Sequence, residues 1–160
     1  MKIFDLTKED VINIKKRQIV ITVLIAVLTV TIIVIFLIVA TRKYFLLFLI
    51  LSIFASFVGT SFFLYFLLGK IKSTNSYLLI LKKSENSATI DEYIFKKADS
   101  EIQIKDGLSF NRYYFVKEET RYVFYVLFNK QMTLQEEDVV RVKSVDNIAL
   151  EMEVLNEKDI

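Results

Sequence analysis

The chain divides into two long apolar stretches and a polar remainder. Gln18–Ala40 contains no charged residue over 23 positions, and Tyr44–Gly69 contains none over 26 positions. Each stretch exceeds the roughly 20 residues that a helix needs to cross a hydrocarbon core. A chain of 160 residues is too small to bury two such helices in a soluble core. The pattern therefore predicts two transmembrane helices.

Only Thr41–Lys43 separates the two stretches, so residues 18–69 are expected to form an antiparallel helical hairpin. The first stretch is longer than the apolar region of a signal peptide, which favours an uncleaved anchor over a cleaved leader. Nine Lys and Arg residues flank the outer ends of the hairpin, against two in its loop. The positive-inside rule then predicts a two-span cell-membrane protein with both termini cytoplasmic, residues 1–17 forming a cytoplasmic N-terminal segment. Within that segment, Thr7–Asp10 fits a helix capping box.

Small residues recur along the second apolar stretch at a spacing that favours close helix packing. They are Ser52, Ala55, Ser56, Gly59 and Thr60. The first stretch offers Thr22, Ala26 and Thr29 on one face. These two faces either pack against each other within the hairpin or form a homo-oligomer or partner interface. Neither stretch contains an ionisable residue, which favours an anchor over a transport pathway and leaves an oligomeric channel as the alternative.

Residues 73–160 are predicted to form one small, soluble, β-rich domain, because apolar and polar positions alternate with a period of two. The predicted strands are Tyr77–Lys82, Glu101–Lys105, Leu108–Lys117, Arg121–Phe128, Val139–Val145 and Leu150–Leu155. A short helix is predicted between the first two strands, over Thr89–Ala98. The fold class is therefore a membrane α-helical hairpin plus a small, mostly-β domain. Short antiparallel strands favour an OB-like barrel, or a sandwich, for that domain.

The first predicted hairpin turn depends on which residues must share a face. A three-residue loop, Lys105–Gly107, places Ile104 opposite Leu108 and keeps the apolar residues on one face. A two-residue Asp-Gly loop would place Ile104 opposite Ser109 and mix the faces. The face pattern therefore favours the three-residue loop.

The same argument predicts a three-residue loop, Asp146–Ile148, in the last hairpin. The apolar face would then pair Val140 with Val154, Val142 with Met152 and Ser144 with Leu150. The other face would pair Arg141 with Glu153 and Lys143 with Glu151, placing opposite charges across the strands. Asn147 or Ile148 is expected to adopt the left-handed conformation, which asparagine tolerates better.

Composition excludes several kinds of chemistry. The chain has no cysteine, histidine or proline and only three glycines, which excludes the common zinc, haem-histidine, Ser-His and phosphate-loop sites. The acidic clusters Asp91–Glu92, Glu118–Glu119 and Glu136–Asp138 fall at predicted turns and helix starts, where solvated acids are ordinary. No catalytic, cofactor-binding or metal-binding residue is therefore predicted, and the chain is not expected to be an enzyme.

The β-rich part carries 14 basic and 16 acidic residues from position 70 onward, a balance that does not favour nucleic acid. Its densest feature is a run of aromatic residues flanked by arginines, which resembles a base-stacking platform. Alternating aromatics in a small β-domain are also what its core requires. A partner-binding patch is the second interpretation, with Tyr113, Tyr114, Arg121 and Tyr125 as its candidate residues.

The stretch "MTLQEEDVVRVKSVDNIALEMEV" is similar to the closing strands of the short NfeD-like membrane proteins. Val140, Val142, Val145, Leu150, Met152 and Val154 stand at the apolar places of that pattern. Glu137, Asp138 and Asn147 stand where the family usually has glycine. The resemblance implies an OB-type barrel behind membrane spans. It also implies a non-enzymatic accessory protein that partners stomatin- or flotillin-type scaffolds. Other small anchored β-domains, such as bacterial PH-like ones, fit nearly as well.

These patterns favour an interaction protein whose hairpin lies in the lipid bilayer and whose cytoplasmic β-domain docks onto a membrane assembly. A sensor that binds a small ligand or lipid headgroup and a small oligomeric channel component are the alternatives.

Overall fold

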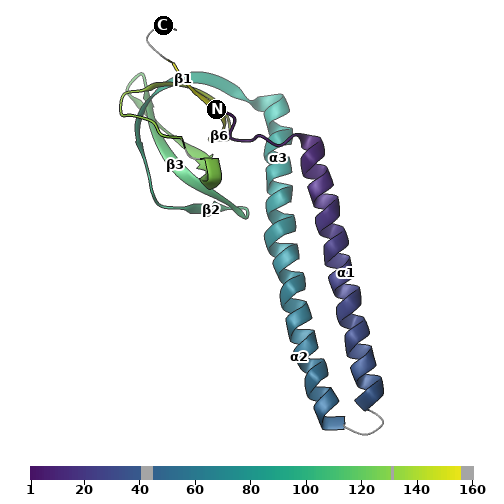
Figure 1. Cartoon of the computed structure of the whole chain (residues 1–160). Coiled ribbons are helices and arrows are strands. Elements are labelled where there is room, and N and C mark those ends of the chain that lie inside the picture. The colour runs from purple at the N-terminus through teal and green to yellow at the C-terminus, as the bar shows by residue number, and fades with distance from the viewer. Residues whose placement is uncertain (41–44, 131, 156–160) are drawn as a thin grey trace. The chain divides into compact units, whose positions relative to one another are not determined.

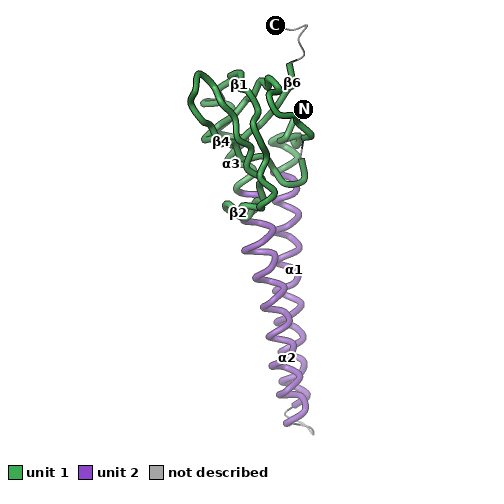
Figure 2. Tube along the Cα trace, turned by 90° about the vertical axis from the view of Figure 1, so that its left-hand side faces the viewer, with its two compact units in different colours: residues 1–11, 76–160 green, residues 12–75 purple. Residues whose placement is uncertain are grey.

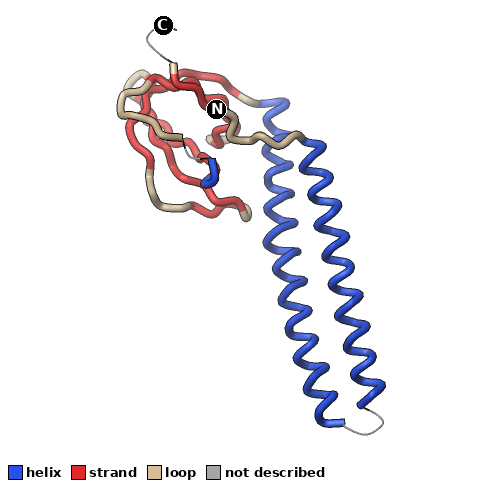
Figure 3. The backbone as a smooth tube through the Cα atoms, viewed as in Figure 1, coloured by secondary structure: helices blue, strands red, loops and turns tan. Residues whose placement is uncertain are grey.

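The computed structural model describes residues 1–40, 45–130 and 132–155 (Figure 1). The chain forms two compact units, which Figure 2 colours separately. Residues 12–75 form the helical unit, and residues 1–11 together with 76–160 form the β unit. Figure 3 draws the strands in red; those of the described residues run from Thr89 to Val154, within the β unit. The predicted Thr41–Lys43 connection lies outside the described residues.

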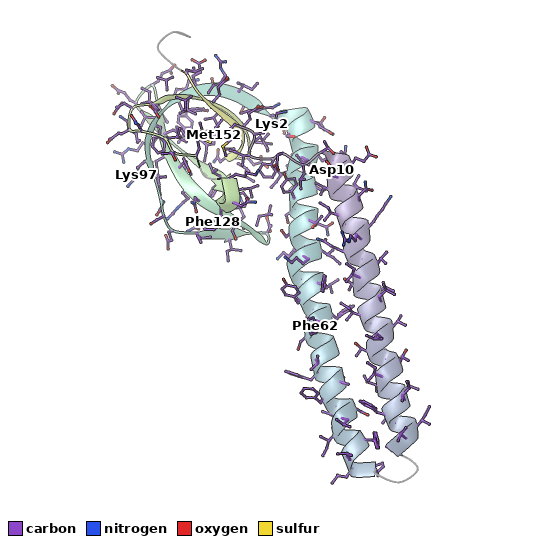
Figure 4. All side chains as sticks on the ribbon, in the orientation of Figure 1. Lys2, Asp10, Phe62, Lys97, Phe128 and Met152 are labelled. Atoms are coloured by element: carbon purple, nitrogen blue, oxygen red, sulfur yellow. The ribbon has the colours of Figure 1, made fainter. Side chains whose placement is uncertain are left out.

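Two helices, each long and apolar enough to cross a membrane, account for the first half of the chain. The first is α1 (Lys8–Ala40). The second runs from 45 to 87 through α2 (Phe45–Leu64), a π-helical segment η1 (Tyr65–Ile71) and α3 (Lys72–Ser87). Apolar side chains project from all around α1 and α2, as Figure 4 shows near Phe62. Water does not favour such surfaces, so these helices require an apolar surrounding.

The predicted capping box at the start of α1 is confirmed. The Thr7 hydroxyl accepts the Asp10 N–H at 3.2 Å, and the Asp10 carboxylate accepts the Thr7 N–H at 3.1 Å. The Thr7 side chain also donates to that carboxylate, and these hydrogen bonds lower the pKa of Asp10. Helix α1 therefore begins at Lys8, ten residues before the apolar stretch.

Six strands make up one mixed sheet. They are β1 (Thr89–Ala98), β2 (Gln103–Lys105), β3 (Leu108–Lys117), β4 (Thr120–Leu127), β5 (Val139–Val145) and β6 (Ile148–Val154). Strand β1 pairs with both β5 and β3, so the pairings run in a circuit from β1 through β5, β6, β4 and β3 back to β1. Strand β4 runs parallel to β6, which corrects the expectation of a wholly antiparallel sheet.

An aromatic cluster fills the core inside this circuit. Tyr93, Phe95, Tyr113, Phe115 and Phe124 are all at least nine-tenths buried. Their rings meet edge-on or tilted, with centroids 5.0–6.1 Å apart, an arrangement that favours aromatic pairs. Buried and exposed positions alternate along β1 and β3, so the aromatic side chains of one face of each strand point into the core.

The first residues of the chain complete the sheet. Strands β4 and β6 pair at a single position, which leaves the rest of the β6 edge open to another segment. The Ile3 N–H donates to the Leu150 carbonyl, and the Met152 N–H donates to the Met1 carbonyl, each at 2.9 Å. Figure 4 labels Lys2 and Met152 at this edge. Ile3 is 1% exposed, so the N-terminal residues belong to the core of the β unit.

Two of the predicted elements are wrong in type. Tyr77–Lys82 is part of helix α3, where Tyr77, Ile80 and Ser84 form one inward face at helical spacing. Thr89–Ala98 is strand β1, not a helix, because its Tyr93 and Phe95 reach the core only with a period of two. Predicted strands β3 and β5 are confirmed to the residue, and β4 is displaced by one residue.

The first hairpin turn differs from its prediction. Asp106 and Gly107 form a two-residue turn with φ of 53° and 79°, so Lys105 lies opposite Leu108 and Ile104 opposite Ser109. The Asp-Gly pair favours this type I′ geometry, because both positions need positive φ. Local turn chemistry therefore overrides the matching of apolar faces.

The last hairpin is predicted in part. Its four outer pairs, Val140–Val154 to Lys143–Glu151, are confirmed. The turn has two residues, Asp146 and Asn147, with φ of 48° and 62°, and Ser144 lies opposite Ala149 instead of Leu150. A β-bulge after Lys143 shifts the register by one residue. The outer apolar pairs therefore keep their predicted partners although the turn is one residue shorter.

Replacing Ile3 by alanine tests the role of the N-terminal residues. Because Ile3 is fully enclosed, Ile3→Ala is expected to destabilise the β unit by about 2–5 kcal/mol. Ile90→Ala is the matched control, since Ile90 is 61% exposed on β1. The loss should appear as a lower thermal unfolding midpoint in near-UV circular dichroism. Equal midpoints for the two variants would show that residues 1–4 do not belong to the folded core.

Candidate functional site

The part of α3 from Ser76 to Lys83 and the hairpin turns of the β unit line a groove, called the α3 groove below. Its cavity volume is about 300 Å³. Helix α3 contributes Ser76, Leu79, Ile80 and Lys83; the strands and turns contribute Lys105, Asp106, Leu108, Phe110, Val145, Asp146 and Ile148. Six of the eleven lining residues are apolar, and the charged groups lie at the two turns and, with Lys83, on α3. A pocket with apolar walls and a few polar groups is the usual form of a small-molecule site.

Polar contacts tie α3 to both turns at the rim of the groove. The Ser76 hydroxyl donates to the Asp106 carbonyl at 2.7 Å. Lys83 pairs with the Asp146 carboxylate, and this hydrogen bond lowers the pKa of Asp146 below its ordinary value. Both ions of that pair are at least half exposed, so the pair fixes position more than it adds stability.

Lys105 is the other cation of the groove. Its ammonium group lies 5.5 Å from the centre of the Tyr125 ring, within the range of a cation–π contact. Tyr125 in turn meets Phe110, a buried residue of the groove wall, at 6.2 Å. The rim can therefore offer a positive charge to an anionic group beside an apolar wall.

A second hollow, the aromatic hollow, lies over β1 and β3 and has a volume of about 340 Å³. It is lined by Lys96, Lys97, Tyr114, Phe115, Val116, Arg121 and Glu136. The Lys97 ammonium lies 5.2 Å from the Tyr114 ring, and Arg121 is exposed. The hollow thus combines aromatic rings with cationic side chains.

The four candidate partner-binding residues are spread over three places. Tyr114 and Arg121 share the aromatic hollow, and Tyr125 lies by the α3 groove through its contact with Lys105. Tyr113 is 2% exposed, and its hydroxyl donates to the Met132 carbonyl at 3.2 Å. Its ring therefore belongs to the aromatic core.

The acidic clusters are dispersed along the β unit. Asp91 pairs with Lys117, Glu92 with Arg141, and Glu137 with Lys96. The turn residues Glu118 and Glu119 adopt positive φ. Within the described residues, no three acidic side chains come together as a metal ion would require.

The small residues of the hairpin lie on two sides of α2. Ser52, Ser56 and Thr60 line one shallow groove with α1, and Ala55 and Gly59 line another. A side chain at Gly59 would meet Thr29: its Cβ would lie 2.2 Å from Thr29 Cγ2 and 2.3 Å from Thr29 Oγ1. The two helices therefore pack closely where Gly59 faces Thr29.

Two contributions to the β unit went undetected in the sequence. Helix α3 supplies four of the eleven residues that line the α3 groove, and the sequence predicts a strand over part of this helix, Tyr77–Lys82. The 3–4 spacing of Tyr77, Ile80, Leu81 and Ser84 also fits a helix. The docking of Ile3 and Phe4 had no local signal, because their partners lie near position 150.

Comparison with known proteins yields no match to a family, to a curated protein or to a solved structure.

Substituting Gly59 tests the close approach of α1 and α2. Gly59→Ala should force Thr29 away and lower the thermal stability of the hairpin, because the new Cβ has no room. Gly69→Ala is the matched control: nothing lies within 4 Å of its Cβ position, and alanine favours a helix over glycine. Unfolding in detergent can be followed by far-UV circular dichroism. Adding Thr29→Gly to Gly59→Ala should restore stability; lack of rescue would refute the contact.

Proposed function

We propose that the chain is a non-enzymatic, membrane-anchored interaction protein. Helices α1 and α2 cross the cell membrane as a hairpin with both termini cytoplasmic, and the β unit docks onto a membrane protein assembly. The observation that carries this proposal is the helix from 45 to 87, which begins as an apolar span and whose later residue Ile80 belongs to the core of the β unit. A domain attached in this way remains at the membrane surface.

An OB-type barrel is the fold we propose for the β unit. The pairing circuit of five strands supports it, because an OB fold is a five-stranded Greek-key barrel. The parallel contact between β4 and β6 is compatible with a Greek-key return of the last strand to an earlier one. Strand β2 lies outside this circuit and pairs only with β3.

The NfeD-like resemblance suggests the kind of partner. In the last hairpin, Val140, Val142, Met152 and Val154 pair across the strands as the apolar positions of the motif require. On that basis the partner would be an oligomeric scaffold of the stomatin or flotillin type. The aromatic hollow, with Tyr114 and Arg121, is the docking surface that we propose for it.

Photo-crosslinking tests the docking surface. A benzophenone side chain in place of Tyr114 should give one adduct of defined mass with another protein in native membranes. The same side chain in place of Phe128 is the control, since Phe128 is an aromatic residue with 43% exposure that does not line the hollow. Identical adducts from both positions, or adducts only with a second copy of the chain, would contradict docking through the hollow.

A second candidate function is the binding of a small amphipathic anion or a lipid headgroup. The α3 groove favours it, because apolar walls stand beside Lys83 and Lys105. Leu79→Trp should fill the groove and release a ligand that native mass spectrometry detects on the unaltered chain. Ile90→Trp is the control, because Ile90 is similarly exposed (61% against 57% for Leu79) but lies outside the groove. Retention of the same ligand by both variants would exclude the groove as its site.

A further inference from the structure

Strand β2 exposes an isoleucine more fully than any other large apolar residue in the described part of the chain. Ile104 has 77% of its surface open to solvent, and Phe57 on the apolar helix α2 follows with 73%. Ile102, two residues before Ile104, is 46% exposed. Because β2 pairs only with β3, it forms an edge of the sheet. Exposed apolar residues at a sheet edge favour association, so soluble proteins usually avoid or cover them.

The exposure of Ile104 follows from the turn beside it. The Asp106–Gly107 turn sets Ile104 opposite Ser109, on the face away from the core. A β-bulge in this hairpin would have returned the isoleucine to the apolar face, as the bulge does in the last hairpin. An apolar residue placed against its pattern marks a candidate contact surface.

The length of the connecting chain limits how far this turn can lie from the end of the apolar stretch. The Ser76 hydroxyl bonds the Asp106 carbonyl, and Ser76 lies six residues after Lys70, the first charged residue beyond the apolar stretch. Six residues span at most about 22 Å when fully extended, and about 9 Å as a helix. Ile104 is two residues from Asp106. This limit on distance holds for every orientation of the β unit relative to the helical unit.

A lipid surface fits this feature better than a protein partner does. Two isoleucines offer far less area than the roughly 800 Å² per partner that a stable protein interface buries. A segment that is already tethered to the membrane needs much less buried area. The tether makes the contact intramolecular and gives it a high effective concentration, so less binding free energy is required. The headgroup layer is roughly 5–8 Å thick on each side of the hydrocarbon core, so a shallow contact is enough. Lys70 and Lys72, which follow the apolar stretch directly, provide the positive charge that anionic lipids attract.

We propose that the β2–β3 turn inserts Ile104 and Ile102 into the headgroup layer of the membrane that α1 and α2 cross. This contact rests on the proposed membrane anchor, because only the anchor brings the turn to a bilayer. The tethered turn acts as a second, shallow point of attachment. It therefore determines which side of the β unit faces the membrane and which side stays open to a partner.

Site-specific fluorescence quenching tests the contact in the full-length chain. The chain contains no cysteine, so each single-cysteine variant carries one reactive thiol. Ile104→Cys, Ile90→Cys and Phe57→Cys would each be labelled with an environment-sensitive dye. The variants would then be placed in nanodiscs of phosphatidylcholine and phosphatidylglycerol that contain lipids spin-labelled near the headgroup and along the acyl chain. Ile90 is the matched control, because it is an exposed isoleucine beyond the far end of α3.

Several-fold stronger quenching at position 104 than at position 90 is expected, with the headgroup label quenching most. Position 57 should be quenched most by the acyl-chain label, which reports on the anchor alone. Quenching at 57 with equal, weak quenching at 104 and 90 would overturn the turn contact and leave the anchor intact. Absence of quenching at 57 would overturn the anchor and the turn contact together. Unchanged thermal midpoints of the three variants would show that labelling leaves the fold intact.

Discussion

The pairing of β1 along both of its edges is the constraint on which the β unit depends. Strand β1 reaches β5 about fifty residues later and β3 about twenty residues later, and these pairings return the sheet to its starting strand. Hydrogen-bonding groups of the central strands are thereby satisfied, and the aromatic rings inside are shielded from water. The remaining open edge of β6 is covered by Met1–Ile3, whose backbone pairs with Leu150 and Met152. The short strand β2 keeps a free edge, which sets it apart from the rest of the sheet.

Two hairpins show how turn chemistry and face matching compete. Both turns use residues with positive φ in a two-residue loop, so in both the local preference of Asp-Gly or Asp-Asn decides the length. In the last hairpin a bulge after Lys143 compensates for the one-residue change in register that the short turn causes. Val142 therefore still lies opposite Met152 on the core face. The β2–β3 hairpin pairs without a bulge, and Ile104 remains outside. The same turn geometry therefore has opposite consequences, depending on whether the strand must fill a core.

Sequence patterns predicted those parts of the molecule whose signal is local. Uncharged runs located the two long helices, and strict alternation located β3 and β5 to the residue. The segment "YLLIL" at 77–81 was ambiguous, because five consecutive apolar residues satisfy a strand and a helix equally. The sequence does not predict strand β1 or the docking of residues 1–4, because their partners are remote in sequence. The spacing of apolar residues within a segment carries no information about such a distant partner. The α3 groove could not be predicted for the same reason, since it joins a misassigned helix to two turns.

Several ion pairs on the β unit link neighbouring strands. Arg141 contacts Glu92 on β1 and Glu153 on β6, and Lys117 contacts Asp91 across the sheet. Such exposed pairs add little free energy, but they oppose slippage of one strand along another. A ligand or partner that relied on these charges would have to break the pairs that position them. Recognition is therefore best served by groups outside the pairs: the cation of Lys105, the Tyr114 ring with Arg121, and the uncovered Ile104.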